Sequence, residues 1–190
     1  VTEETLQEHE ATVLSHYLKE VRSMYSLLSP STTRVNFSHW FLASLEKDRA
    51  LVPEDEYEVL DRFEQEPYRQ KLIMIYRRLV ATKKQNEISW SQVPAEEMDP
   101  RAYGSVNQFL DDLYLIRDSL LANQGERLVR GRFARLIRSA QVFGFHMASL
   151  DLRQHSKRHR EAAGEIFAKN QTVDDYQSLS ESEKIAVLSR

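Results

Sequence analysis

The sequence predicts a mainly α-helical fold with one substantial strand. At least five segments repeat apolar residues every three or four positions, which is the spacing of a helix. One segment, 142–154, alternates with a period of two, which is the spacing of a strand. With 190 residues, of which 41% are hydrophobic, the chain is long enough to bury a real core.

Composition narrows the function classes. The net charge of −3 and the 29% of charged residues argue against a general nucleic-acid binder. The chain has no cysteine, which excludes disulfides and fits a cytoplasmic protein. No apolar run approaches the roughly 20 residues that cross a bilayer, so we expect no membrane partner.

The N-terminal part, 1–85, is expected to be helical. Its apolar stripes predict helices near 5–28, 38–51, 54–63 and 67–85. Ser38 is the expected N-cap of the second helix, and Pro67 suits the first position of the fourth. The first stripe also fits a short coiled coil, but three to four turns of it are more typical of core packing.

A long loop, 86–104, separates this part from the rest. It contains Pro94 and Pro100 and shows no sustained period. Trp90 is either a binding aromatic or an anchor of the loop to the body, and the anchor is the commoner role. We interpret the loop as an insertion rather than a site.

The remaining part, 105–190, is expected to hold a helix pair, the strand and further helices. Ser105 and Gln108 have the spacing of a capping box for a helix to Asn123, and a second helix is expected near 130–140. Arg132, Arg135 and Arg138 repeat along that second helix, as on a solvated or ion-paired face.

The segment 142–154 is apolar on both faces over most of its length, which is typical of a strand in a parallel sheet or a helix-rich α/β (TIM-like) barrel. Functional groups in such folds gather at the carboxyl end of the strand, where Asp151 and Arg153 stand. Residues i and i+2 share a face, so Asp151 can hold Arg153 while the guanidinium points outward. Arg153 is therefore the first candidate for a ligand contact.

Ser156 is the expected N-cap of the next helix, whose first turns carry Lys157, Arg158 and Arg160. Cations are disfavoured at the positive end of a helix, and a bound anion would reverse that penalty. These three residues are weaker candidates for a phosphate or carboxylate site around Arg153. The alternative is that Arg153 only pairs with Asp151 and the other cations are solvated.

The histidines offer no convincing metal site. His155 and His159 lie four apart, but no third ligand is evident, and His159 is expected on the buried side of its helix. His146 is expected to be a core histidine. Further on, Ser180 and Glu183 have the spacing of a capping box.

The run from Phe143 to Ser156, followed by His159, resembles the FG-hydrophobic-LDIRQ-x-S-x-x-H segment of phosphoenolpyruvate carboxylases, with Leu152 where isoleucine is common. Glu66 to Arg69 resembles the EPYR stretch of that family, and Val1 to Leu6 resembles the segment that follows its GGDRDGNP motif. The similarity runs over most of the chain, so we expect 1–190 to be a single fragment of a larger protein.

The resemblance implies a cytoplasmic enzyme that joins bicarbonate to phosphoenolpyruvate with Mg²⁺ or Mn²⁺, in a helix-rich α/β barrel that assembles as a homotetramer. It places the phosphate-contacting arginine of the family on Arg153. The TAHPTE-like histidine motif, the glycine-rich arginine loop and the metal-binding carboxylates of the family do not occur in this sequence. We therefore expect no catalytic residue and no metal ligand here, and an inactive isolated fragment. The rival hypothesis is a stand-alone helical interaction or anion-binding module.

Overall fold

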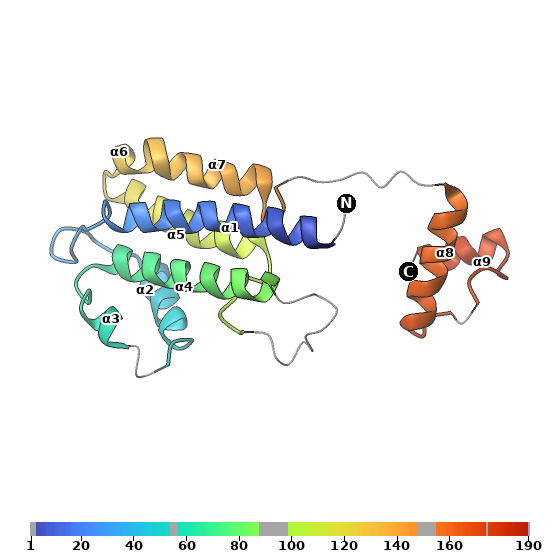
Figure 1. Cartoon of the computed structure of the whole chain (residues 1–190). Helices are drawn as coiled ribbons and strands as arrows, with labels where there is room; N and C mark the ends of the chain where they lie inside the picture. The colour runs from blue at the N-terminus through green and yellow to red at the C-terminus, as the bar shows by residue number, and fades with distance from the viewer. Residues whose placement is uncertain (1–2, 54–56, 88–98, 148–154, 174, 190) are drawn as a thin grey trace. The chain divides into compact units, whose positions relative to one another are not determined.

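The computed structural model describes residues 3–53, 57–87, 99–147, 155–173 and 175–189. The chain divides into two compact units, Val1–Ala148 and Ser149–Arg190 (Figure 1). All regular structure in the described residues is helical, which confirms the mainly α-helical part of the prediction. No described helix has both the length and the hydropathy required of a membrane span.

The first unit is a bundle in which the long helices run side by side (Figure 1). Its elements, in order, are α1 (Glu3–Tyr25), α2 (His39–Arg49), α3 (Tyr57–Asp61), α4 (Pro67–Glu87), α5 (Val106–Ala122), α6 (Glu126–Leu128), η3 (Val129–Phe133) and α7 (Ala134–Phe143). α4 continues two residues into the expected loop 86–104, of which 88–98 lie outside the described residues. The role predicted for Trp90 therefore stays a prediction.

The core of this unit lies where α1 packs along α4 and where α5 and α7 close over them. The predicted stripe of α1 is buried, with Leu14, Tyr17 and Val21 almost fully covered. These residues recur at three- and four-residue spacing because such positions stack on one face of a helix. The apolar pattern therefore located the core of the unit correctly.

Two predicted caps have different outcomes in this unit. The Ser38 hydroxyl accepts from the Phe41 amide at 3.2 Å, so the predicted N-cap of α2 is confirmed. Ser105 stands at the N-cap of α5 but makes no side-chain cap bond. The Gln108 carbonyl oxygen accepts from the Gly104 amide at 3.1 Å and from Arg78 at 3.3 Å. The predicted capping box is wrong because the Gln108 side chain is taken by the amide of Gly104, which precedes the N-cap, and by Arg78 of α4.

The helix expected near 130–140 is broken at its start. Within η3, Arg130 has an extended ψ of 166° and Gly131 has a φ of 74°, a region that glycine enters without a Cβ penalty. α7 begins only at Ala134. Its buried side carries Leu136, Ile137 and Ala140, as the sequence predicted.

The strand predicted for 142–154 is wrong over its first six residues. Val142 and Phe143 end α7, Gly144 caps it with a φ of 55°, and residues 145–147 turn. A strand must pair its backbone with neighbouring strands, and the described residues offer none. The remainder, 148–154, lies outside the described residues.

The second unit contains α8 (Ser156–Lys169) and α9 (Glu181–Leu188). Phe167 of α8 packs on Tyr176 with ring centroids 5.1 Å apart, and Tyr176 is buried. The predicted capping box of Ser180 and Glu183 is confirmed at the start of α9. Ser156 is the first residue of α8 and not its N-cap, because His155 takes that place and accepts from the Lys157 amide at 3.3 Å.

Candidate functional site

The two residues with the strongest prediction, Asp151 and Arg153, lie outside the described residues. The structure describes the elements on either side of them, each within its own unit. These are the turn 144–147 that follows α7 and the first turns of α8.

The first turns of α8 carry the weaker anion candidates, and all three are exposed. Lys157 lies 3.9 Å from Glu161 one turn later, a weak solvent-screened contact. Arg158 and Arg160 project from a helix end whose first turn has no acidic residue. His155 already caps the Lys157 amide, so an anion bound near this end would be held by the helix dipole and by these exposed cations.

A tyrosine of α1 holds the turn after α7. The Tyr17 hydroxyl donates to the Gly144 carbonyl at 2.7 Å, and the Ser139 carbonyl lies 3.2 Å from the same oxygen. Burial raises the pKa of Tyr17 to about 12. The hydroxyl therefore remains a donor at every physiological pH.

Phe145 anchors the same turn to the core. Its ring is buried and lies 6.2 to 6.4 Å, between centroids, from the rings of Phe109, Tyr17 and Tyr103. Aromatic rings at such separations pack favourably beyond the area that they bury. The backbone on either side of Phe145 is thereby fixed to α1 and α5.

His146 is not the core histidine that the sequence predicted, since 70% of its side chain is exposed. Its Nδ1 lies 3.0 Å from a carboxylate oxygen of Glu10, whose side chain is only 6% exposed. The other Glu10 oxygen is buried with no hydrogen-bond partner among the described residues. His146 thus covers a buried acid from outside. In the turn at the end of α7, the side chain of Phe145 is the one inserted into the core, and His146, the next residue, stays at the surface.

A buried ion network lies elsewhere in the first unit, and sequence reasoning missed it. The Lys71 ammonium is fully buried, 2.7 Å from Asp48 of α2, 2.6 Å from Asp112 of α5 and 2.7 Å from the Ser44 hydroxyl. The sequence held one signal: Lys71 falls on the apolar stripe of α4, four residues before Ile75. Burial raises the pKa of the Asp48 carboxyl, and the charge of Lys71 opposes that rise.

Arg78 and Tyr103 complete the network around Asp112. Arg78 donates to one Asp112 oxygen at 2.9 Å and stacks 3.9 Å from the centre of the Tyr103 ring. The Tyr103 hydroxyl donates to the same oxygen at 2.7 Å. Burial, followed by the Asp112 charge, raises the pKa of Tyr103 well above its usual value. The charged groups of this network bind one another, so its role is to join α2, α4 and α5 rather than to bind a ligand.

The described residues do not fit a divalent cation. Nowhere in the described ranges do three His, Asp or Glu side chains gather as a ligand set. His155 and His159 are both exposed on α8, so the prediction that His159 lies on a buried side is wrong. None of the residues of α8 is buried, so the helix has no buried side on which His159 could lie.

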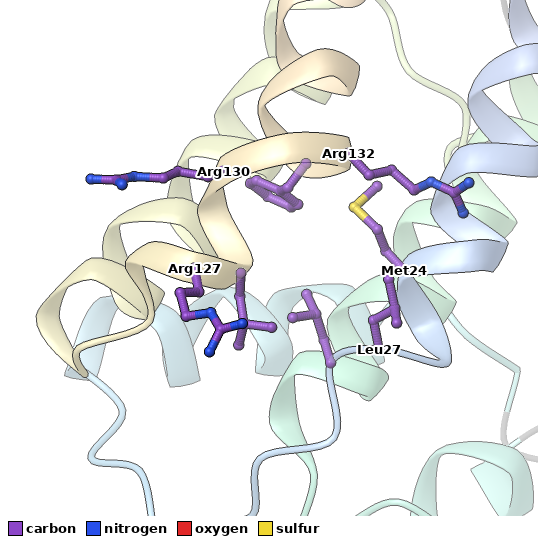
Figure 2. Close-up of a pocket in the computed structure, with 8 residues that line it drawn as sticks. Met24, Leu27, Arg127, Arg130 and Arg132 are labelled. Atoms are coloured by element: carbon purple, nitrogen blue, oxygen red, sulfur yellow. The ribbon is translucent and has the colours of Figure 1, made fainter.

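A pocket of about 150 Å³ opens between the end of α1 and the α6–η3 stretch (Figure 2). Its floor is apolar, with Met24, Leu28 and Phe133. Its rim carries arginines 127, 130 and 132, which come from the kinked stretch that precedes α7. Sequence reasoning found Arg132 as part of a row of arginines with Arg135 and Arg138 but did not find the pocket.

Comparison with known proteins supplies the family context. The family model described as phosphoenolpyruvate carboxylase matches residues 1–190. Curated phosphoenolpyruvate carboxylases are similar to the chain: 34% identity to that of Burkholderia mallei over 98% of the chain, 33% to that of Roseiflexus castenholzii over 100%, and 35% to that of Ralstonia nicotianae over 100%. The chain covers 18%, 20% and 19% of these relatives, about a fifth of their length.

Proposed function

The chain belongs to the phosphoenolpyruvate carboxylase family, and on that premise we propose that it works as one segment of an enzyme that joins phosphoenolpyruvate and bicarbonate into oxaloacetate and phosphate. The observation that carries the proposal is the family match over the whole chain, with relatives at 33% to 35% identity. The same match favours this function over a stand-alone helical interaction or anion-binding module, since it covers both units.

The segment's own contribution is Arg153, which we assign to the phosphate group of phosphoenolpyruvate, with Asp151 orienting the guanidinium. A planar guanidinium donates two parallel hydrogen bonds to a phosphate, which fixes both the position and the orientation of the group. Lys157, Arg158 and Arg160, at the dipole-positive end of α8, add favourable potential for the same dianion.

Contacts in the first unit support this role by fixing the chain just upstream. Tyr17 holds the Gly144 carbonyl, Phe145 is inserted into the aromatic cluster, and His146 pairs with Glu10. A binding arginine is effective only when the backbone before it has few conformations, because ordering it on binding costs free energy. These contacts reduce that cost.

The rest of the proposed enzyme supplies what the described residues do not. We assign the Mg²⁺ or Mn²⁺ ion, the general base and the mobile arginine loop to other parts of the longer polypeptide, which we propose to be a cytoplasmic homotetramer. A divalent ion bound by those other parts would supply Lewis-acid stabilisation of negative charge at the reacting oxygens. The residues of this segment bind and orient the substrate.

The test is an assay of the longer polypeptide that contains this segment. With phosphoenolpyruvate, bicarbonate and Mg²⁺, oxidation of NADH by coupled malate dehydrogenase should follow oxaloacetate formation, and omission of bicarbonate should abolish it. Equal rates with and without bicarbonate, or no rate from folded protein, would refute the proposed function.

A further inference from the structure

Two pockets lie in line along the seam between α1 and the η3–α7 stretch. The pocket of Figure 2 adjoins Met24 of α1 and Leu28, which follows the helix, and a second pocket, of about 160 Å³, adjoins His16 and Glu20 of α1. His16, Glu20 and Met24 follow one another at four-residue intervals, which places these three residues on one ridge of α1. Arg132 lines both pockets. At 1.5 Å per residue the stretch of α1 from His16 to Met24 is roughly 12 Å long, and we name this seam the α1–η3 groove.

The groove has a strong positive charge on one wall. Residues 127–138 contain five arginines and no acidic residue, and all five arginines are exposed: Arg127, Arg130, Arg132, Arg135 and Arg138. Glu20 is the acidic residue among those that line the two pockets, and it lies 3.4 Å from Arg132. Arg132 also donates to the Ser23 hydroxyl. The described residues therefore neutralise only one of these five charges.

The arginines are arranged to meet several negative charges rather than one. Figure 2 shows the side chains of Arg130 and Arg132 extending to opposite sides of the pocket, because the backbone is kinked between them at Gly131. Guanidinium groups that bind a single phosphate must converge on it. Those of the groove are instead distributed along the seam, which matches carboxylates spaced along a polypeptide.

The apolar parts of the groove point to the same class of ligand. Leu27 and Leu128 beside the first pocket are 58% and 39% exposed, while Met24 and Phe133 form a floor. Exposed leucines next to an apolar depression gain by burial against an aliphatic or aromatic side chain. A nucleic-acid backbone offers no such anchor, and the chain as a whole is acidic, with a net charge of −3.

We propose that the α1–η3 groove docks an acidic polypeptide segment, with one apolar side chain in the pocket of Figure 2 and carboxylates paired with Arg127, Arg130 and Arg135. The interaction goes beyond the proposed carboxylase function and does not depend on it. Its free energy comes from apolar burial at the pocket, and its specificity and association rate come from the arginines.

The test uses the purified 190-residue chain and a fluorescein-labelled helical peptide of about 12 residues. The peptide consists of glutamate and alanine, with two leucines four positions apart. Fluorescence anisotropy should show saturable binding that weakens as salt is raised, since exposed charges are screened. The same peptide with lysine in place of glutamate should not bind.

Matched variants locate the interaction. Arg127→Glu/Arg130→Glu should weaken peptide binding at least about tenfold, and Leu27→Ser about threefold. Arg34→Glu/Arg62→Glu reverses the same amount of charge at exposed positions that line neither pocket, and should change affinity less than about twofold. Circular dichroism of each variant shows that it is folded.

Four results would overturn the inference: no saturable peptide binding, equal losses in the groove and control variants, tighter binding of a single-stranded oligonucleotide at the same salt, or displacement of the peptide by millimolar inorganic phosphate at constant ionic strength. The last would identify a single-anion site. Loss of carboxylation by the longer enzyme would not bear on this interaction, and loss of peptide binding would not bear on the carboxylation.

Discussion

The ammonium nitrogen of Lys71 lies 2.6 Å from a carboxylate oxygen of Asp112, with both residues buried in the first unit. Lys71 also pairs with Asp48 at 2.7 Å, so one cation of α4 holds acids from α2 and α5. Because these charges are buried, removing Lys71 leaves Asp48 without its paired cation and Asp112 with Arg78 alone, at a high cost.

Lys71→Ala is therefore expected to lower the free energy of unfolding by about 3–5 kcal/mol, since it leaves Asp48 and Asp112 buried without their shared cation. Urea denaturation followed by circular dichroism measures it. Lys84→Ala removes an exposed cation from the same helix and should change stability by less than about 0.5 kcal/mol. Similar small losses in both variants would show that the network does not join the helices.

Tyr17→Phe should alter both stability and its pH dependence. Near pH 7 the variant should lose about 1 kcal/mol, because the Gly144 carbonyl loses its donor. Tyrosine in an unfolded chain ionises near pH 10, whereas burial raises the pKa of Tyr17 to about 12. Between these values the unfolded chain has released this proton while the native chain keeps it. The Tyr17 contribution is thus complete below about pH 10 and declines as the pH rises towards 12.

Unfolding free energies measured at about pH 7, 9 and 11 test whether the contribution of Tyr17 to stability declines at high pH. The parent chain should lose more stability than Tyr17→Phe between pH 9 and 11. Tyr68 and Tyr103, whose pKa values burial also raises, leave some loss in the variant. A pH dependence as steep in the variant as in the parent would contradict the account of Tyr17.

His146→Ala should lower stability by about 1–3 kcal/mol, because both Glu10 oxygens would then be buried without a partner. Adding Glu10→Leu should recover much of this loss, since no carboxylate remains to be satisfied. A double-mutant cycle built from the four unfolding free energies measures the coupling. Additive losses would mean that His146 and Glu10 do not interact in solution.

The helices of the first unit could be predicted from sequence because their stability comes from apolar stripes, which are a local pattern. Leu14, Tyr17 and Val21 of α1 lie in the core as their spacing required. The break at Gly131 could not be placed by the same pattern, because the apolar residues Phe133, Leu136 and Ile137 all follow it and their spacing does not mark where the helix begins.

The buried network and the turn after α7 depend on partners that are distant in sequence, which explains most of the wrong predictions. Lys71 is buried only because Asp48 and Asp112 come from two other helices. Phe143, Phe145 and Met147 alternate like a strand, but Gly144 ends α7 there and Phe145 finds its aromatic neighbours by turning inward. Periodicity over so short a segment does not distinguish a helix end and turn from a strand. The assignments of Asp151 and Arg153 stay predictions.

The isolated 190-residue chain should form no oxaloacetate. The described residues provide no divalent-cation ligand set, and we assign the general base to other parts of the proposed enzyme. The coupled malate dehydrogenase assay measures this, with a boiled sample as the control. Turnover by the purified chain above that control would show that the catalytic groups have been misassigned.

Arg153 is proposed to bind the substrate phosphate, and kcat/KM for phosphoenolpyruvate in the longer enzyme distinguishes this role from a purely structural one. If paired hydrogen bonds to the phosphate are lost, Arg153→Ala should lower kcat/KM by the equivalent of about 2–4 kcal/mol with little change in Tm, and Arg153→Lys should recover only part of it. If Arg153 serves only to neutralise Asp151, the alanine variant should instead melt at a lower temperature and keep the parental kcat/KM at equal folded concentration. That second result would contradict the claim.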